Sequence, residues 1–381
     1  MSSSWGSSWT ASKGQLIRRS KADDSVISTT VVGPVITETN AGSQISVNSP
    51  GPPYTQSNNW VLNRANRRVG RLSGTARSSS FGWYYDVVDY PIVYGSGFTY
   101  PATNWSYWAT QALSGRNPNK PLIDVPLFVF ELKDFPGMLR DLGRVLSNRM
   151  RPDDIPGAHL AYQFGWAPLF SDIQTLITLG SQIDSSISKW NSIKNKKRVS
   201  GKLESYRQLV GGRSGSYTAP YNMGRASWSF NLYHKRDVWY TAHIGSDFQL
   251  PDWSSPVSRA RWALGLNASY STIWNALPWS WLVDYFINIS AFLDANRVTP
   301  VIMHNMCIMC QDSMEIDKFE CSSVYDFSNL EASAPKLADS RKLRQVVANP
   351  HARIAWKPNP LFGKLPILTS LITATALRKA R

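Results

Sequence analysis

The stretch YQFGWAPLFSDIQTL, residues 162–176, places a glycine and a proline inside a pattern that otherwise indicates a helix. Because a helix break would normally reset the phase of its apolar residues, and the phase is kept, we predict one kinked helix. Pro168 leaves the carbonyl of Phe164 without its helical donor, and Gly165 allows close packing beside the bend. The seam typical of a helical bundle runs in steps of four and three through Tyr162, Trp166, Leu169, Ile173, Leu176, Gly180, Ile183, Ile187 and Trp190.

Helical patterns also lie on both sides of this stretch. Before it, apolar residues recur at helical spacing at Leu132, Phe135, Leu139, Leu142, Leu146 and Met150. After it, a helical pattern resumes around residues 258–269 and strengthens in LPWSWLVDYFINISAFLDAN, residues 277–296. Pro278 suits a helix start there, and the narrow polar strip predicts a helix buried nearly all round. A short amphipathic helix is expected at the C-terminus.

Strand patterns fill most of the remaining chain. SVISTTVVGPVITET (25–39), FGWYYDVVDYPIVYG (81–95) and ASWSFNLYHKRDVWYTAHIG (226–245) are rich in β-branched and aromatic residues, and GGRSGS (211–216) predicts a loop. The expected fold class is α+β, with an α-helical bundle region and an elongated antiparallel β-sheet region, both built from discontinuous segments. We assign residues 1–125, 199–254 and 301–357 to the β-rich region, and residues 126–198, 255–300 and 358–381 to the helical region.

The composition favours a polyanionic partner. The 381 residues include 41 Lys and Arg against 26 Asp and Glu, a formal charge of +15, together with sixteen Trp and sixteen Tyr. Such a charge predicts attraction to nucleic acid or to an anionic membrane surface. The N-terminus has no apolar signal region, and Asp284 and Asn288 interrupt the apolar run Ala276–Leu293, so we expect a soluble, non-secretory protein that is not an integral membrane protein.

Catalytic motifs are missing from the sequence. It contains no Walker loop, Rossmann fingerprint, G-x-S-x-G elbow or H-E-x-x-H motif, so an enzyme has no positive support, and no cofactor or small-molecule substrate is expected. His304, Cys307 and Cys310, with the later Cys321, could in principle surround a zinc ion. On a strand, however, residues three apart point to opposite faces, so buried free thiols are favoured and no metal is expected.

Basic residues cluster beside three of the predicted helices. Counterion release makes Lys and Arg the main source of nucleic-acid affinity, and the three clusters favour RNA or DNA contact over merely solvated charged faces. The candidate RNA-binding residues are Arg140, Arg144, Arg151, Lys194, Lys196, Lys197, Arg198, Arg378, Lys379 and Arg381.

Two helical motifs resemble the maturation protein (A protein) family of the single-stranded RNA bacteriophages. The first, Gln-Phe-Gly-Trp followed by Pro-Leu and Ser-Asp-Ile, is matched by Gln163, Phe164, Gly165, Trp166, Pro168, Leu169, Ser171, Asp172 and Ile173. The second, a Trp, a Pro and Val-Asp-Tyr, is matched by Trp274, Pro278, Val283, Asp284 and Tyr285. We expect these motifs to be structural, with Trp166, Leu169 and Ile173 packed against Leu282, Phe286 and Ile289.

The resemblance implies a non-enzymatic virion protein that takes the place of a coat-protein dimer in the capsid. It implies that the helical region binds the viral genomic single-stranded RNA, and that the β region projects outward and attaches the particle to a bacterial pilus. It further implies assembly in the host cytoplasm and entry into the host with the RNA. Receptor contact would lie on exposed aromatic loops, with burial in the β core as the alternative, at Trp83, Tyr84, Tyr85, Trp105, Tyr107 and Trp108.

Two other readings of the same features stay open. One is a cellular basic RNA-binding protein without a virion role. The other is a membrane-active protein that uses Ala276–Leu293 and the C-terminal helix.

Overall fold

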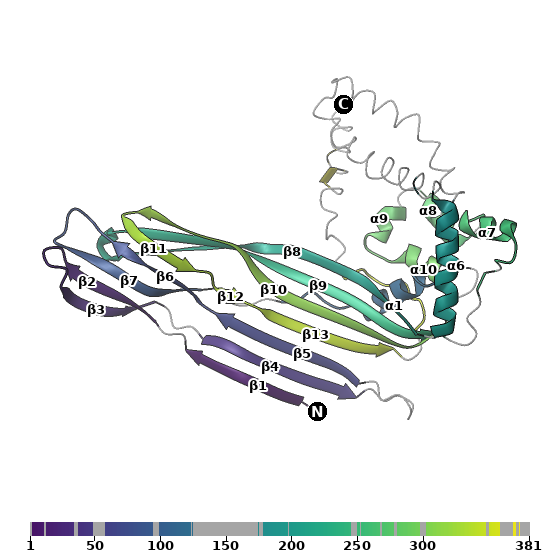
Figure 1. The fold of residues 1–381 in the computed structure, drawn as a ribbon, viewed down its shortest axis with the longest axis horizontal. Helices are drawn as coiled ribbons and strands as arrows, with labels where there is room; N and C mark the ends of the chain where they lie inside the picture. The colour runs from purple at the N-terminus through teal and green to yellow at the C-terminus, as the bar shows by residue number, and fades with distance from the viewer. Residues whose placement is uncertain are drawn as a thin grey trace, which may run out of the picture. The chain divides into compact units, whose positions relative to one another are not determined.

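The computed structural model describes residues 2–10, 13–33, 37–48, 58–93, 99–122, 124, 174, 178–196, 198–244, 250–251, 253–266, 269–277, 280–297, 302–347, 350–358, 369–370 and 373 (Figure 1). Within these residues, long antiparallel strands predominate and helices take a smaller share. The predicted α+β class is therefore confirmed, with β structure as the main component.

The chain divides into two compact units, each assembled from three separate segments. The first unit consists of Met1–Tyr100, Lys202–Trp239 and Cys307–Val346, and the second of Pro101–Gly201, Tyr240–Met306 and Val347–Arg381. The chain passes from one unit to the other within each of the three longest strands described. These are β8 (Arg198–Thr218), β9 (Arg225–Ile244) and β10 (Met303–Tyr325).

One sheet in the described part of the chain has eight strands, in the order β1–β4–β5–β13–β10–β9–β8, with β12 paired to β5 (Figure 1). Its other members are β1 (Ser2–Thr10), β4 (Thr37–Asn48), β5 (Asn58–Arg68), β12 (Lys336–Leu337) and β13 (Asp339–Val347). The order places β13 between β5 and β10, so segments about 280 residues apart in the chain become neighbours. Such pairings depend on the whole chain rather than on local pattern.

Burial in β9 alternates strictly along the strand. From Phe230 to Ile244, every even-numbered residue is buried and every odd-numbered residue is more exposed. This period of two is what an antiparallel sheet with one covered face requires. The long strand predicted at 226–245 is thereby confirmed.

A second sheet has five strands in the described residues, in the order β11–β6–β7–β2–β3. These are β2 (Gly14–Ser20), β3 (Val26–Val32), β6 (Gly70–Ala76), β7 (Trp83–Ile92) and β11 (Phe327–Ser333). The predicted strands in SVISTTVV and FGWYYDVVDYPI are thus present, as β3 and β7. An apolar core joins this sheet to the adjoining ends of β8 and β9, and it includes Leu16, Leu72, Val87, Ile92, Tyr217, Ala226 and Phe327.

The predicted loop GGRSGS is wrong, because these residues continue β8. Gly215 provides room for an aromatic ring rather than for a turn: a Cβ there would lie 2.7 Å from the Trp228 ring. The turn between β8 and β9 instead lies at Pro220–Asn222, where Tyr221 and Asn222 have positive φ. Ala219 N–H donates to the Gly224 carbonyl across it, at 2.9 Å.

Residues 105–114 form a helix, α1 (Trp105–Ser114), although they belong to a segment expected to be β-rich. The Asn104 side chain caps its N-terminus by accepting from the Tyr107 amide at 3.1 Å. The chain then continues through α6 (Leu179–Lys196), α7 (Pro256–Ala263), α8 (Tyr270–Ala276), α9 (Ser280–Asp284) and α10 (Ile289–Ala295). Within the second unit, α1 and α8 both pack against α10.

The single buried helix expected at 277–296 is also wrong, because α9 and α10 are separated by residues 285–288. Asn288 lies between the two helices, and its side chain is hydrogen-bonded to the segment around residue 354. It accepts from Ala355 N at 2.6 Å and donates to the Arg353 carbonyl at 3.2 Å. Ile287 forms a β-bridge with Trp356. Val283 is 37% exposed, so this region is not buried on every side.

Several predictions fall on residues outside the described ranges. They are the helix at 132–150, the kink at Gly165 and Pro168, and the packing of Trp166, Leu169 and Ile173. Only the last part of the predicted seam is described, and there Ile183 and Ile187 are half-buried and Trp190 is buried in α6.

Candidate functional site

The basic cluster between α6 and β8 is the part of the predicted RNA surface that the structure places. Lys194 and Lys196 lie in the last turn of α6, where cations complement the helix dipole. Arg198 begins β8 and is exposed, and it has no ion pair among the described residues. Lys197 and the other candidates, Arg140, Arg144, Arg151, Arg378, Lys379 and Arg381, lie outside those residues.

The first residues of β8 are fixed to the interior of the second unit. Val199 is 4% exposed, directly after the exposed Arg198. The Arg116 guanidinium donates to the Ser200 carbonyl and, at 2.9 Å, to the hydroxyl of buried Tyr240. Arg198, the last residue of the cluster, is therefore the first residue of a strand whose backbone is held at a defined position. This arrangement favours a preformed contact surface.

Asp284 of the second motif connects two helices of the same unit. One carboxylate oxygen accepts from the Trp274 indole N–H at 3.0 Å, and the other accepts from the Ser290 backbone N–H, also at 3.0 Å. Trp274 belongs to α8 and Ser290 to the first turn of α10. The carboxylate thus satisfies an otherwise unpaired donor at a helix start and orients a large side chain, which is a structural role. Pro278 lies outside the described residues, as do Phe164, Gly165, Trp166, Pro168, Leu169 and Asp172.

The aromatic residues proposed for receptor contact do not lie on exposed loops, so that expectation is wrong. Trp83, Tyr84 and Tyr85 are in β7, where Tyr84 and Tyr85 are buried and Trp83 is half-buried beneath the Arg18 guanidinium, 3.9 Å from the ring centre. Their alternating apolar pattern fits the β-core alternative. For the other predicted stretch, residues 105–108, the sequence did contain signals of a helix. These signals are the capping Asn104 and the helical spacing of residues 105, 108, 109, 112 and 113.

The second aromatic group lies in α1. Trp108 is fully buried, and its ring packs edge-to-face on Trp105 with 5.3 Å between centroids. Tyr107 lies between them in the same helix and has its backbone N–H bonded to Asn104. Trp5, Trp9 and Trp356, which were not predicted to contact a receptor, are exposed tryptophans in the described part of the chain.

A buried ionic cluster lies in the interior of the first unit. The Asp312 carboxylate accepts from Arg236 Nε at 2.6 Å and from Arg341 at 3.0 Å, and lies 2.9 Å from His234 Nε2. Burial opposes ionisation, but the hydrogen bonds from His234 and Arg236 outweigh it and lower the pKa of Asp312 to about 2. Asp312 and Arg236 are both fully buried, so each requires the other as a counter-charge.

Cys310, beside this cluster, lacks the properties of a nucleophile. Burial, with the Asp312 charge as a second cause, raises the pKa of Cys310 to about 12, so its thiol stays protonated. Cys307 accepts a hydrogen bond from Arg344 at 3.0 Å, on the other face of the strand, and His304 is exposed. Among the described residues, no three His, Cys, Asp or Glu side chains are placed to hold a metal ion.

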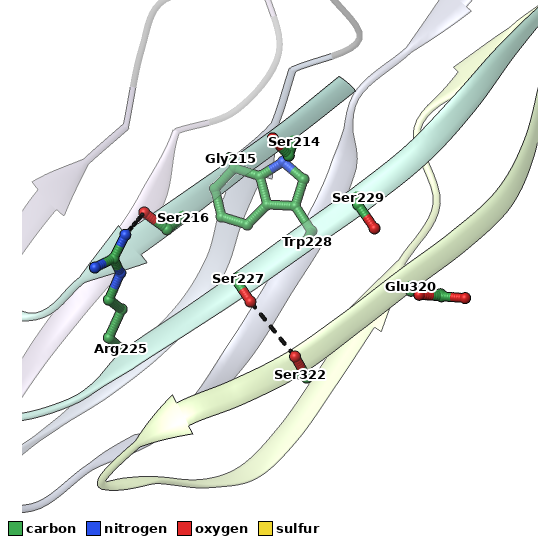
Figure 2. A pocket seen from close by; sticks show the side chains of 9 residues that line it. All are labelled: Ser214, Gly215, Ser216, Arg225, Ser227, Trp228, Ser229, Glu320 and Ser322. Carbon is green, nitrogen blue, oxygen red and sulfur yellow. Dashed lines mark hydrogen bonds between the residues drawn. The ribbon is translucent and has the colours of Figure 1, made fainter. Parts of the chain in front are cut away.

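A shallow polar groove of about 390 Å³ lies across β8, β9 and β10 (Figure 2). Arg225 donates to the Ser216 hydroxyl at 3.1 Å, and the Ser227 and Ser322 hydroxyls lie 3.4 Å apart. The lining offers serine hydroxyls, the Arg225 guanidinium and the Glu320 carboxylate to a ligand. It consists of Ser214, Gly215, Ser216, Arg225, Ser227, Trp228, Ser229, Glu320 and Ser322.

No helix in the described ranges combines the length and the apolar character needed to cross a bilayer. In comparison with known proteins, residues 132–317 match the family model described as phage maturation protein. That span runs from before α6, through β8, β9 and α7–α10, into β10. No curated protein matches the chain.

Proposed function

We propose that this chain is a virion protein that binds the genomic RNA of a single-stranded RNA phage, because residues 132–317 match the phage maturation protein family model. In this proposal it takes the place of a coat-protein dimer in the capsid and attaches the particle to a bacterial pilus for genome entry. The family match over residues 132–317 carries the proposal, because that span contains both the Asp284 motif and the Lys194–Arg198 cluster.

The second unit, which contains the helices α1 and α6–α10, is the side that we propose for RNA and capsid contact. The exposed Arg198 follows the lysines at the end of α6, and the fixed start of β8 gives this charge a constant position. Four cations within five residues neutralise phosphates without reading base sequence, so affinity should fall steeply with salt. The first unit, called here the β-rich unit, is the side that we propose for receptor contact.

The virion role is tested by protein analysis of purified particles. We expect this chain at a small fixed ratio to the coat subunit, and a reconstruction without imposed symmetry should show it at one capsid position. A chain absent from RNA-containing particles would instead support a cellular RNA-binding protein.

RNA contact is tested by changing Lys194, Lys196, Lys197 and Arg198 together to glutamine. Neutralising four charges should weaken genomic RNA binding and flatten the dependence of log K on log salt by about 3, at roughly 0.7 per phosphate contact for single strands. Replacing the paired cations Lys202, Arg207 and Lys235 provides a control, because their charges are already matched by carboxylates. Unchanged affinity and slope in the first variant would exclude this cluster from the RNA surface.

A further inference from the structure

One face of the eight-stranded sheet gathers tryptophans and cations from β1, β5, β12 and β13. Residues directly opposite each other in an antiparallel pair share a face, as do residues two apart along a strand. By register, Trp5 lies opposite Gly42 and Gly42 opposite Arg64, so no side chain separates Trp5 from Arg64 along that row. The residues on this face, called here the Trp–Arg face, are Trp5, Trp9, Trp60, Arg64, Arg68, Lys336, Lys342 and Arg344.

The cations of the Trp–Arg face are not neutralised. Arg64, Arg68, Lys336 and Lys342 form no ion pair among the described residues, and Arg64, Arg68 and Lys336 are exposed. Glu38, opposite Trp9, is the one acidic residue that the register of these strands assigns to the same face, against five cations. This part of the sheet therefore presents an excess of positive charge.

Some cations of the other strands on the same face are paired with carboxylates. Arg344 contacts Cys307 of β10, which places the odd-numbered residues of β10 on the Trp–Arg side. There Arg207 of β8 lies 2.9 Å from Asp317 and 3.6 Å from Glu315, and Lys235 of β9 lies 3.8 Å from Asp237. The cations at these positions of β8 and β9 are therefore paired with carboxylates, whereas Arg64, Arg68, Lys336 and Lys342 have no ion pair among the described residues.

Exposed aromatic rings accompany these unpaired cations. Trp5 is 45% exposed and Trp9 is 38% exposed, although a buried position would normally be preferred for both. Four residues apart on one strand, they lie about 14 Å from each other at ~3.4 Å per residue, which allows each to stack a different base. The exposed Asn40 and Gln44 of β4 share the face and offer amide groups to base edges.

We propose that the Trp–Arg face binds unpaired nucleotides of the RNA. The inference rests on the proposed function for the identity of the RNA, but it adds a contact surface in the β-rich unit, apart from the helical cluster. A sheet face with exposed indoles suits unpaired bases, because the bases of a duplex are stacked on each other and cannot stack on the rings. The cations bind the phosphates between them.

The test uses the full chain and a fluorescein-labelled single-stranded U12 oligoribonucleotide, with fluorescence anisotropy as the readout. Arg64→Gln with Arg68→Gln should weaken binding at least tenfold and reduce the salt slope by about 1.4, for two phosphate contacts. The matched control is Arg207→Gln with Lys235→Gln, on the same face of the same sheet but already paired, and it should leave the affinity within about twofold.

A second variant separates stacking from charge. Trp5→Ala should weaken U12 binding about fivefold or more without changing the salt slope, and Trp5→Phe should restore most of it. A 12-base-pair RNA duplex should bind more weakly and be insensitive to Trp5→Ala. Equal losses in the Arg64/Arg68 pair and its control, or no loss with Trp5→Ala, would overturn the proposal.

The outcomes also separate this proposal from the proposed function. If the variant at Lys194, Lys196, Lys197 and Arg198 loses genomic RNA binding while the Arg64/Arg68 and Trp5 variants bind U12 normally, the Trp–Arg face is wrong and the RNA-binding function stands. If the unaltered chain binds neither RNA, both are wrong.

Discussion

At the scale of single residues, charge pairing distinguishes structural groups from candidate binding groups. Asp312 and Arg236 have no exposure to solvent and satisfy each other, whereas Arg64 and Arg198 are exposed and unpaired in the described structure. A buried pair fixes the interior because removing one partner leaves an uncompensated charge. An exposed unpaired cation contributes little to stability and remains available to an anion.

Protonation of Asp312 should cost stability in acid. Its pKa in the folded protein, about 2, lies below the ordinary value of 3.8, so its stabilisation is present above about pH 4 and is lost as the pH falls toward 2. That difference corresponds to about 2 kcal/mol of unfolding free energy. Asp312→Asn mimics the protonated state, so we expect it to lower the free energy of unfolding at pH 7 by a similar or larger amount, measured by urea denaturation.

The control for this prediction is Asp317→Asn, which removes a carboxylate from an exposed pair with Arg207 and should have a much smaller effect. Because other carboxylates also titrate in acid, the informative quantity is the difference between the original chain and Asp312→Asn. That difference should shrink between pH 4 and pH 2, and a constant difference would contradict the assignment.

At the scale of elements, the local pattern predicted strands well and helix boundaries less well. The period-two alternation of β9 and the β-branched composition of β3 and β7 follow from short-range sequence, and these strands are present. The run at 277–296 satisfies helical spacing, yet Asn288 bonds to Arg353 and Ala355 and interrupts it. Those partners lie 65 and 67 residues away, beyond any local pattern.

Strand β3 is an edge strand with exposed apolar residues. It ends the five-stranded sheet, and Val26, Ile27 and Val31 are 54%, 50% and 63% exposed. Edge strands without charge can pair with other chains, and a lysine is a common natural protection. We expect Val31→Lys to reduce self-association of the purified chain at high concentration, measured by light scattering, while the melting temperature stays nearly constant.

The matched control is Val87→Lys, in β7 of the same sheet. Val87 is 1% exposed, so a lysine there buries a charge in the core and should prevent folding. Undiminished association of Val31→Lys would show that the free edge of β3 is not the site of contact between chains.

At the scale of the whole molecule, the family match and the folding units have different boundaries. The match covers residues 132–317, which takes in β8, β9 and part of β10 but none of β13, the neighbour of β10 in the sheet. The core around Tyr217 and Ala226 also needs Leu16, Leu72 and Val87, which lie before the matched span. The shared segment is therefore not a folding unit by itself.

We accordingly expect a fragment of residues 132–317 to lack cooperative folding. It would expose a long edge of β10 and lose most of one apolar core, both of which favour aggregation. Circular dichroism during heating should show a transition for the full chain and none for the fragment. A cooperative transition in the fragment would mean that its strands find sufficient partners within the matched span.

The sequence by itself determined the α+β class, several of the strands, the positive charge and the resemblance to phage maturation proteins, because alternation, composition and short motifs depend on residues close together in the chain. It did not determine which cations are neutralised. Arg207 and Arg64 look alike in sequence, but the sheet order brings Asp317 to Arg207 across 110 residues and leaves Arg64 facing Gly42 and Ser340. Only the tertiary structure decides such pairings, because Coulomb attraction acts over a few ångströms in space whatever the separation along the chain.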